Sequence, residues 1–325
     1  MKIAILGAGA WGTALGLVLD KNGHEITLWS HNAEGLREIQ SAGRNVRYLP
    51  EVPLPSTWLF EPSLGVAIRS AGAVVMALPS KAFRYVAEQL GALSCPIVSV
   101  TKGIEYETHR TMTEVLRHCV PDARISALSG PTFALEVARG FPCAIVAASR
   151  EQSAAEETQA LFHRTIFRVY TSTDVPGVEL GGALKNVIAI AAGVGDGLGF
   201  GDSSKAALVT RALAEMRRLG VACGALPDTF AGLSGLGDLT VTCFSALSRN
   251  RRFGERLGRG EKLQDLLARP KELTEGYPTA RSAYQLARRI GAETPIIDEV
   301  YAMLYKGKNI VDSLRDLTAR SSKPE

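Results

Sequence analysis

A glycine-rich segment at the start of the chain constrains its fold more than any other feature. The apolar run Lys2–Leu6 leads into Gly7-Ala-Gly9-Ala-Trp-Gly12, and a helical pattern follows. This is the dinucleotide-binding spacing: the first glycine permits a tight turn, the second lets the backbone approach a pyrophosphate, and the third lets the helix pack on the strand. The helix start offers N–H groups and a positive dipole end to phosphates. The segment therefore predicts a bound dinucleotide.

Apolar strands alternate with helices as far as about residue 173. Continuous apolar strands separated by helices indicate a parallel, doubly wound sheet of the Rossmann type, covered on both faces. The proline-rich stretch 43–62 is predicted to be an irregular connection. Strands are expected at 2–6, 25–29, 73–78, 96–100, 125–129, 144–147 and 167–170, and helices after Gly9, from about Glu34, and at 81–90, 111–120 and 151–162.

The second half of the chain has a different pattern and is predicted to be all-α. No strand is expected after about Thr173. A chain of 325 residues favours two domains, so we expect a dinucleotide-binding domain at 1–175 and a helical substrate-binding domain at 176–325. Its helices are expected at about 178–194, 203–219, 248–257, 278–290 and 294–304.

Composition argues against several classes of protein. The hydrophobic share of 46% and the charged share of 22% are ordinary for a globular chain. No segment approaches ~18 uninterrupted apolar residues, so no membrane span is expected, and no secretory signal pattern opens the chain. The net charge of +4 does not favour nucleic-acid binding. Five scattered cysteines without a CxxC pair suit the cytoplasm and argue against disulfides or a metal site.

The end of the second expected strand bears on the choice of cofactor. NAD-specific sites carry an acidic residue there that holds the ribose 2′-hydroxyl, whereas this chain has Ser30-His31-Asn32. These side chains are compatible with a 2′-phosphate, which would favour NADP. Alternatively, they simply cap the helix that follows.

Two further strands end in residues suited to substrate chemistry. Lys102 follows the strand 96–100, at the edge where open α/β sheets bind ligands, and it suits an anionic or carbonyl substrate; a solvated loop lysine is the alternative. Ser129-Gly130-Pro131-Thr132-Phe133-Ala134 follows the strand 125–129. Pro131 is expected in the first turn of a helix whose free N–H groups face the same edge, although a turn without function fits equally.

Lys185 is the most informative single residue. It lies in an apolar helical stretch, and the positions three and four away are Gly181, Gly182, Ile188 and Ala189. A lone ammonium on such a face is costly unless a group outside the helix satisfies it. Burial favours the neutral amine of a lysine, which suits general acid–base catalysis. A lysine that reaches water along the helix edge remains the alternative.

A carboxylate and a basic helix start complete the candidates. Asp238 follows the glycine-rich stretch 232–237; it either caps a short helix or, on a pliant loop, orients Lys185 or a substrate hydroxyl. Ser248-Arg249-Asn250 is predicted to open a helix, with Ser248 as its cap and N–H groups beside Arg249 that suit a phosphate. The arginines that follow fit a solvated face better than a nucleic-acid surface, because aromatic stacking residues are nearly absent.

Taken together, these motifs resemble the bacterial NAD(P)-dependent sn-glycerol-3-phosphate dehydrogenases. The resemblance runs from Lys2 to roughly Leu317. It is carried by GAGAWGTALG at 7–16, TKGIE at 101–105, SGPTFA at 129–134, ALKNV at 183–187, GLGDLTVTC at 235–243, SRN at 248–250 and TEG at 274–276.

The resemblance implies reversible hydride transfer between NAD(P)H and dihydroxyacetone phosphate, which yields sn-glycerol 3-phosphate for phospholipid synthesis. It implies that Lys185 transfers the proton and that Lys102 contacts cofactor and substrate. The remaining implied substrate residues are Gly130, Thr132, Asp238, Ser248, Arg249 and Asn250. The implied cofactor residues are Gly7, Gly9, Ala10, Trp11, Gly12, His31, Lys102, Ala134, Arg249, Leu273 and Glu275.

Two positions depart from the family pattern. Ala10 stands where serine is frequent, so only its backbone would serve, and His31 stands where arginine is frequent. The choice between NADH and NADPH therefore stays open, and a homodimer is expected.

Two other hypotheses compete with this one. The first is a related two-domain dehydrogenase acting on 3-hydroxy acids or on 6-phosphogluconate, which also pairs a Rossmann domain with a helix-borne lysine. The second is a regulatory protein that senses a dinucleotide. The phosphate-binding pattern at Arg249 and Asn250 and the Lys102 motif favour a small phosphorylated ketone over the first. A sensor would need only the site of the first domain, whereas this chain offers substrate chemistry at Lys102, Lys185, Asp238 and Arg249.

Overall fold

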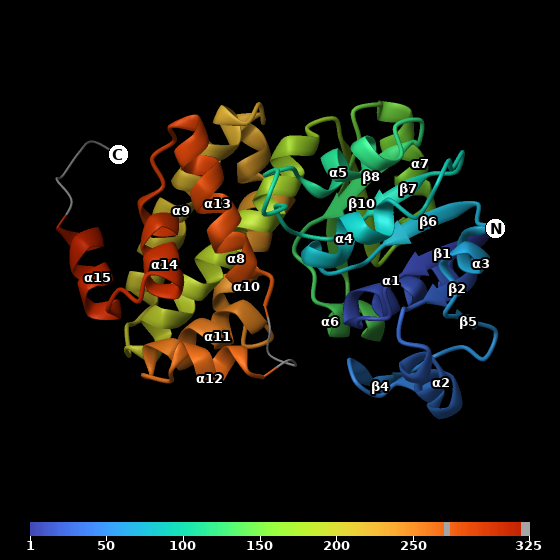
Figure 1. Ribbon diagram of the computed structural model, residues 1–325, viewed down its shortest axis with the longest axis horizontal. Coiled ribbons are helices and arrows are strands. Elements are labelled where there is room, and N and C mark those ends of the chain that lie inside the picture. The colour runs from blue at the N-terminus through green and yellow to red at the C-terminus, as the bar shows by residue number, and fades with distance from the viewer. Residues whose placement is uncertain (270–273, 320–325) are drawn as a thin grey trace. The chain divides into compact units, whose positions relative to one another are not determined.

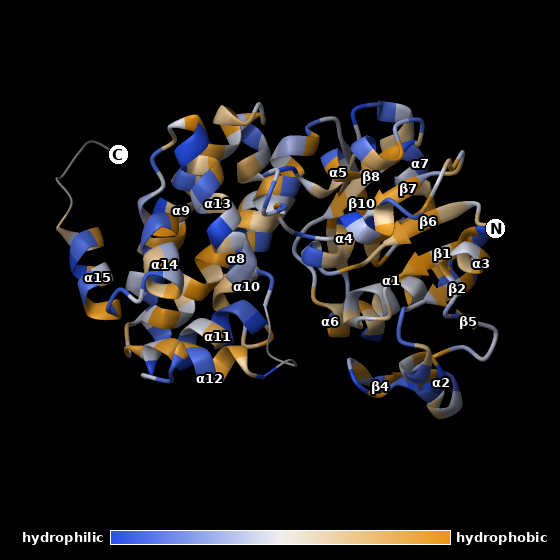
Figure 2. Cartoon of the chain, viewed as in Figure 1, coloured by the Kyte–Doolittle hydropathy of each residue, from blue (hydrophilic) through white to orange (hydrophobic). Residues whose placement is uncertain are grey.

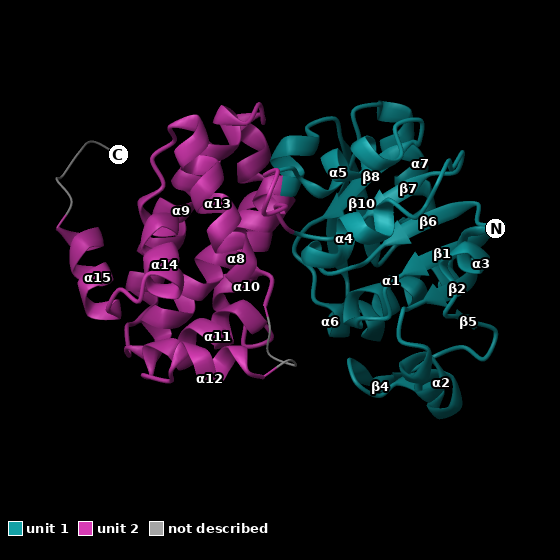
Figure 3. Cartoon of the chain, viewed as in Figure 1, with its two compact units in different colours: residues 1–102, 110–179 teal, residues 103–109, 180–325 magenta. Residues whose placement is uncertain are grey.

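The computed structural model describes residues 1–269 and 274–319. The chain divides into two compact units (Figure 3), and each is described by itself. Unit 1 comprises Met1–Lys102 and Arg110–Glu179, and unit 2 comprises Gly103–His109 and Leu180–Glu325.

Unit 1 is built on an eight-stranded, mostly parallel sheet (Figure 1) in the order β10-β9-β8-β7-β6-β1-β2-β5. β1 lies between β2 and β6, both parallel to it, so the chain reverses its direction of winding at β1, where such sheets bind ligands. The strands are β1 (Lys2–Leu6), β2 (Glu25–Trp29), β5 (Leu59–Glu61), β6 (Ala73–Met76), β7 (Ile97–Ser99), β8 (Ile125–Ser129), β9 (Cys143–Ala148) and β10 (Phe167–Ser172), and a separate hairpin holds β3 (Arg44–Asn45) and β4 (Leu49–Pro53).

Helices cover both faces of this sheet. Its central strands are hydrophobic along most of their length (Figure 2), as strands that are buried on both faces are expected to be. Ile3 and Ile5 of β1 belong to a core with α1, α6 and α7, whereas Ala4 and Leu6 belong to a second core with α3, α4 and α5. The helices are α1 (Ala10–Lys21), α2 (Ala33–Ala42), α3 (Leu64–Ile68), α4 (Ser80–Ala87), α5 (Met112–Cys119), α6 (Ala134–Arg139) and α7 (Gln152–Phe162). The Rossmann prediction is confirmed.

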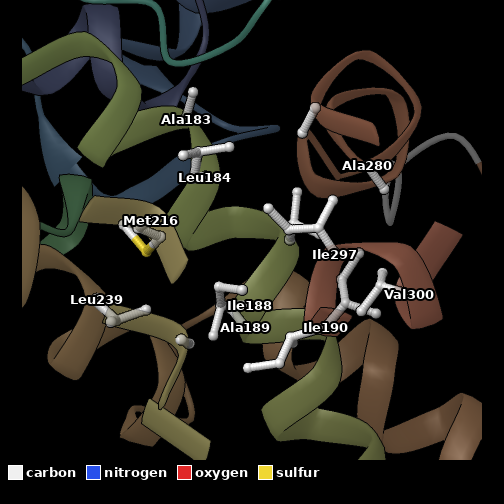
Figure 4. Close-up of a cluster of buried hydrophobic side chains, with 14 of the residues drawn as sticks. Ala183, Leu184, Ile188, Ala189, Ile190, Met216, Leu239, Ala280, Ile297 and Val300 are labelled. Carbon is white, nitrogen blue, oxygen red and sulfur yellow. The ribbon is translucent and has the colours of Figure 1, made fainter. Parts of the chain in front are cut away.

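Unit 2 contains only helices in its described part, as predicted. Its core surrounds α8, and Figure 4 shows Leu184, Ile188 and Ile190 of α8 among side chains from α9, α10, α13 and α14. The elements are α8 (Val175–Gly197), α9 (Asp202–Ala222), a 3-10 turn (Pro227–Ala231), a π-helical turn (Leu233–Gly237), α10 (Asp238–Phe244), α11 (Arg249–Gly258), α12 (Leu263–Leu267), α13 (Gly276–Ile290), α14 (Pro295–Tyr305) and α15 (Ile310–Thr318). The first five residues of α8 belong to unit 1.

α8 is long and apolar enough to cross a membrane. However, 94% of its most apolar window is buried inside the protein. It is therefore the core helix of unit 2.

The structure corrects the sequence predictions for unit 1 at three places. The stretch 43–62 is not irregular throughout, because it contains β3, β4 and β5. These strands are short and lie near prolines, in a small hairpin and at a sheet edge, so they have no clear apolar pattern in the sequence. β9 runs antiparallel to β8, which the apolar pattern cannot reveal, because strands buried on both faces look alike in either direction. Pro131 is not in a helical first turn, since α6 begins only at Ala134 after Phe133 in extended backbone.

Candidate active site

The glycine turn of unit 1 has the geometry that the fingerprint predicts. Gly7 has φ +124°, and a Cβ there would lie 2.2 Å from the Ala77 carbonyl oxygen; a Cβ on Gly12 would lie 2.1 Å from the Gly7 oxygen. Both positions therefore require glycine. Gly9 has open space around it and precedes α1 without a side-chain cap or an acidic residue in the first turn. This helix start suits the pyrophosphate of a dinucleotide.

A buried asparagine supports the glycine turn, and sequence reasoning missed it. Asn45, on β3, donates from Nδ2 to the Ala8 carbonyl oxygen at 3.0 Å and to Thr13 Oγ1 at 2.8 Å. It ties the β3–β4 hairpin to the turn. Because β3 is only two residues long, no periodic pattern identifies this residue.

The end of β2 serves partly as a helix cap. Asn32 accepts a hydrogen bond from the Gly35 N–H and caps α2, while its own N–H donates to Ser30 Oγ. The His31 side chain is exposed. Ala10 and Trp11 open α1.

Three predicted substrate residues of unit 1 lie together. Lys102 Nζ donates to the Gly130 carbonyl oxygen at 3.1 Å, and the Thr132 hydroxyl donates to the same oxygen at 3.3 Å. Gly130 is packed so closely that a Cβ would lie 2.9 Å from Ile145 Cα. The ends of β7 and β8 thus present an amine and a hydroxyl at one place, and Ala134 follows as the first residue of α6.

In unit 2, Lys185 is buried and its partners come from α10. Its side chain is 7% exposed and that of Asp238 is 0% exposed. Lys185 Nζ donates to Asp238 Oδ1 at 2.5 Å and to Thr242 Oγ1 at 2.7 Å. The Thr242 hydroxyl in turn donates to the Asp238 carbonyl oxygen at 2.6 Å. Burial alone would penalise this ammonium, and the carboxylate offsets that cost.

Gly181 lets α8 approach the turn that leads into α10. A Cβ on Gly181 would lie 2.5 Å from the Ser234 carbonyl oxygen, so α8 contacts the π-helical turn backbone to backbone. Asp238 is therefore neither a loop residue nor the cap of α10: the turn Leu233–Gly237 runs directly into the helix and Asp238 is its first residue. π-helical turns are frequent at functional sites.

Thr242 is a functional candidate that sequence reasoning missed. Its i+4 spacing from Asp238 within GLGDLTVTC was the available signal, because residues four apart share a helix face. The next residue, Cys243, is also enclosed, and burial raises the pKa of its thiol to about 12. The thiol is therefore neutral and takes no part as a nucleophile.

The start of α11 is joined to α8 and α13 by amide side chains. Ser248 caps α11 by accepting from the Arg251 N–H at 3.2 Å. Asn250 donates from Nδ2 to Asn186 Oδ1 and accepts from the Gly276 N–H, both at 2.9 Å. Arg249 is exposed beside this cap. Asn186, which follows Lys185, is a third residue that sequence reasoning missed, after Asn45 and Thr242.

The last two predicted cofactor residues precede α13. Glu275 is the N-cap residue of α13 and is partly buried. Leu273 lies outside the described residues.

Comparison with known proteins agrees over the whole chain. The family described as NAD-dependent glycerol-3-phosphate dehydrogenase N-terminus matches residues 2–155, and its C-terminus matches residues 174–315. Glycerol-3-phosphate dehydrogenase [NAD(P)+] of Syntrophotalea carbinolica is 46% identical over 100% of this chain and 99% of its own length, and that of Geobacillus thermodenitrificans is 47% identical over 100% and 96%.

The solved structures agree as well. Glycerol-3-phosphate dehydrogenase from Coxiella burnetii has a TM-score of 0.94 at 36% identity and covers 98% of this chain and 99% of its own. The matches confirm glycerol-3-phosphate dehydrogenase [NAD(P)+] activity with NAD(P) as coenzyme. The chain belongs to the NAD(P)-dependent glycerol-3-phosphate dehydrogenase family.

Proposed function

We propose that the chain reduces dihydroxyacetone phosphate reversibly to sn-glycerol 3-phosphate, with Lys185 as the proton donor in reduction and the acceptor in oxidation. The observation that carries this proposal is the buried contact of Lys185 Nζ with Asp238 and Thr242. Bound NAD(P)H supplies the hydride for the carbonyl carbon. The carbonyl oxygen then gains negative charge and needs a proton, which a buried ammonium is suited to give.

Asp238 has an orienting role in this scheme. It is fully buried and pairs with Lys185, while Thr242 accepts a second hydrogen bond from the same nitrogen. Two acceptors on one helix fix the position of Nζ, and an amine held in place transfers a proton faster than a mobile one.

The phosphate group is proposed to bind at the start of α11, which we call the phosphate site (Ser248–Asn250). It combines the N-terminus of a ten-residue helix with the exposed guanidinium of Arg249, and both favour a dianion. Lys102, Gly130 and Thr132 of unit 1 are proposed as further substrate contacts. Binding energy from the phosphate, remote from the reacting carbon, serves to position the carbonyl.

The cofactor is proposed to bind the glycine turn. The proposed contacts are Gly7, Gly9, Ala10, Trp11, Gly12, His31, Lys102, Ala134, Arg249, Leu273 and Glu275. We propose in addition that the domains correspond to residues 1–175 and 176–325, and that the enzyme is a cytoplasmic homodimer that supplies the phospholipid backbone.

The test is the oxidation of NADH or NADPH by dihydroxyacetone phosphate in the Lys185→Ala and Lys185→Arg variants. Removing the proton donor lowers kcat by about 10²-fold or more. Arginine keeps the positive charge but does not release its proton, so it is expected to fail as well. NADH affinity and the thermal midpoint are the controls. A Lys185→Arg variant with wild-type kcat would refute the proton-transfer role.

A further inference from the structure

α8 and α11 contact each other backbone to backbone along a seam of four glycines. At each of them an added Cβ would lie 1.9–2.4 Å from a carbonyl oxygen of the other helix. They are Gly193 and Gly197 of α8, and Gly254 and Gly258 of α11. Such a seam sets the separation of the helices, but glycines offer no side chains to resist a slide of one helix along the other. The hydrogen bond from Asn250 to Asn186 is one contact that resists it.

A carboxylate beside the seam adds a charged contact between the helices. Asp196 of α8 lies with Oδ1 2.6 Å from Lys205 Nζ of α9 and with Oδ2 2.6 Å from Arg251 Nε of α11. The three side chains are only 11–15% exposed, so water screens the charges weakly. Lys205 also lies over the Phe244 ring at the end of α10.

Arg251 connects this carboxylate to the phosphate site. Its side chain pairs with Asp196, and its backbone N–H donates to Ser248 Oγ, the cap of α11. Arg249 is two residues away on the same helical turn. A displacement of Arg251 along α8 therefore displaces the cap and Arg249 with it.

We propose that Asp196 is a positioning residue for the phosphorylated substrate: by holding Arg251 it fixes the start of α11 on α8, the helix that carries Lys185. The inference rests on the proposed phosphate site. Neutralising Asp196 leaves Arg251 paired with Glu255 of its own helix, at 3.2 Å, so this charge pair no longer holds it to α8. Repulsion from Lys205 then moves Arg251 away. The spacing between the proton donor and the phosphate site then changes.

The experiment compares Asp196→Asn with the matched control Glu299→Gln. Glu299 is also a little-exposed carboxylate of unit 2 (16%), and it is paired with Lys308 at 2.7 Å. Asp196→Asn is expected to lower kcat/KM for dihydroxyacetone phosphate by at least about tenfold, mainly through KM. The kcat/KM for dihydroxyacetone, which has no phosphate, is expected to change less than about twofold, as is KM for NADH. Glu299→Gln is expected to leave all three near wild type.

A double-mutant cycle tests the route through Arg251. Arg251→Gln is expected to reproduce the loss, and Asp196→Asn with Arg251→Gln is expected to lose no more than the worse single variant. Equal losses for dihydroxyacetone and its phosphate, or losses that multiply in the double variant, would overturn the positioning role.

Arg249→Ala separates this inference from the proposed function. If Arg249→Ala leaves KM for dihydroxyacetone phosphate unchanged, the phosphate of the substrate binds elsewhere. The proposed phosphate site and the positioning role of Asp196 are then both refuted. If Arg249→Ala raises KM while Asp196→Asn does not, the phosphate site stands and only the role of Asp196 is refuted.

Discussion

Glu215 makes the stability of unit 2 depend on pH in a calculable way. This carboxyl group of α9 is 1% exposed and accepts hydrogen bonds from the N–H groups of Ile296 and Ile297, both at 2.9 Å, in the first turn of α14. Burial is the largest influence on it and raises its pKa to about 7, although the two N–H donors act in the opposite direction. The perturbation to test is Glu215→Gln, which has no ionisable group.

The magnitude follows from linkage. An unfolded glutamate has a pKa near 4.5, so between about pH 4.5 and 7 the folded protein binds a proton that the unfolded chain has released. Stability therefore falls as pH rises through this window, and above about pH 7 both states are ionised and the loss is complete. Each pH unit is worth about 1.4 kcal/mol, so the whole loss is about 3 kcal/mol. Glu215→Gln removes this pH dependence.

The assay is urea unfolding of wild type and variant at several pH values from about 5 to 8. This range covers most of the window in which stability falls and the plateau above it. Far-ultraviolet circular dichroism reports the helices of both units, whereas tryptophan fluorescence reports unit 1 alone, where Trp11, Trp29 and Trp58 all lie. A circular-dichroism change without a fluorescence change therefore belongs to unit 2. The amide accepts only one of the two N–H donors, so the variant is expected to be less stable at pH 5 by about 1–3 kcal/mol. This deficit is expected to vanish or reverse by pH 8. A difference between wild type and variant that stays constant with pH would refute the reasoning.

Two further predictions concern the active site. Gly12→Ala is expected to weaken NADH binding at least about tenfold, because its Cβ would lie 2.1 Å from a backbone oxygen and overpacking displaces α1. Gly65→Ala, where nothing lies within 4 Å, is the control. Equal NADH affinities of the two variants would contradict the prediction. Asp238→Asn is expected to lower kcat by about 10²-fold or more. It is also expected to lower the urea midpoint, because breaking a buried ion pair costs about 3–5 kcal/mol. A kcat within about twofold of wild type would show that Lys185 does not need the carboxylate.

The sequence predicted what depends on local pattern. The turn Gly7–Gly12, the sheet and the helical second half all follow from glycine spacing and from periodic apolar residues. It did not predict β5 or the direction of β9, because these depend on which strands become neighbours. The sequence did offer Asp238 as a carboxylate that orients Lys185, with helix capping as the alternative, and the structure shows the contact. It did not identify Thr242, the second partner of Lys185, because that contact depends on how α10 packs against α8, 57 residues away in the chain.

The arrangement around α8 nevertheless follows from simple helix arithmetic once its partners are known. At 100° per residue, Lys185 and Asp196 are eleven residues apart and lie about 20° apart around the helix, so they share one face, separated by about 16 Å along the axis. Asn186, Gly193 and Gly197 lie within about 40° of one another on an adjacent face, and each of these three meets α11. One face of the helix therefore carries charged side chains, and the other brings α11 close. Because a helix is stiff over three turns, a group fixed at Asp196 has a fixed distance to Lys185, which is what a substrate with a phosphate at one end and a reacting carbonyl at the other requires.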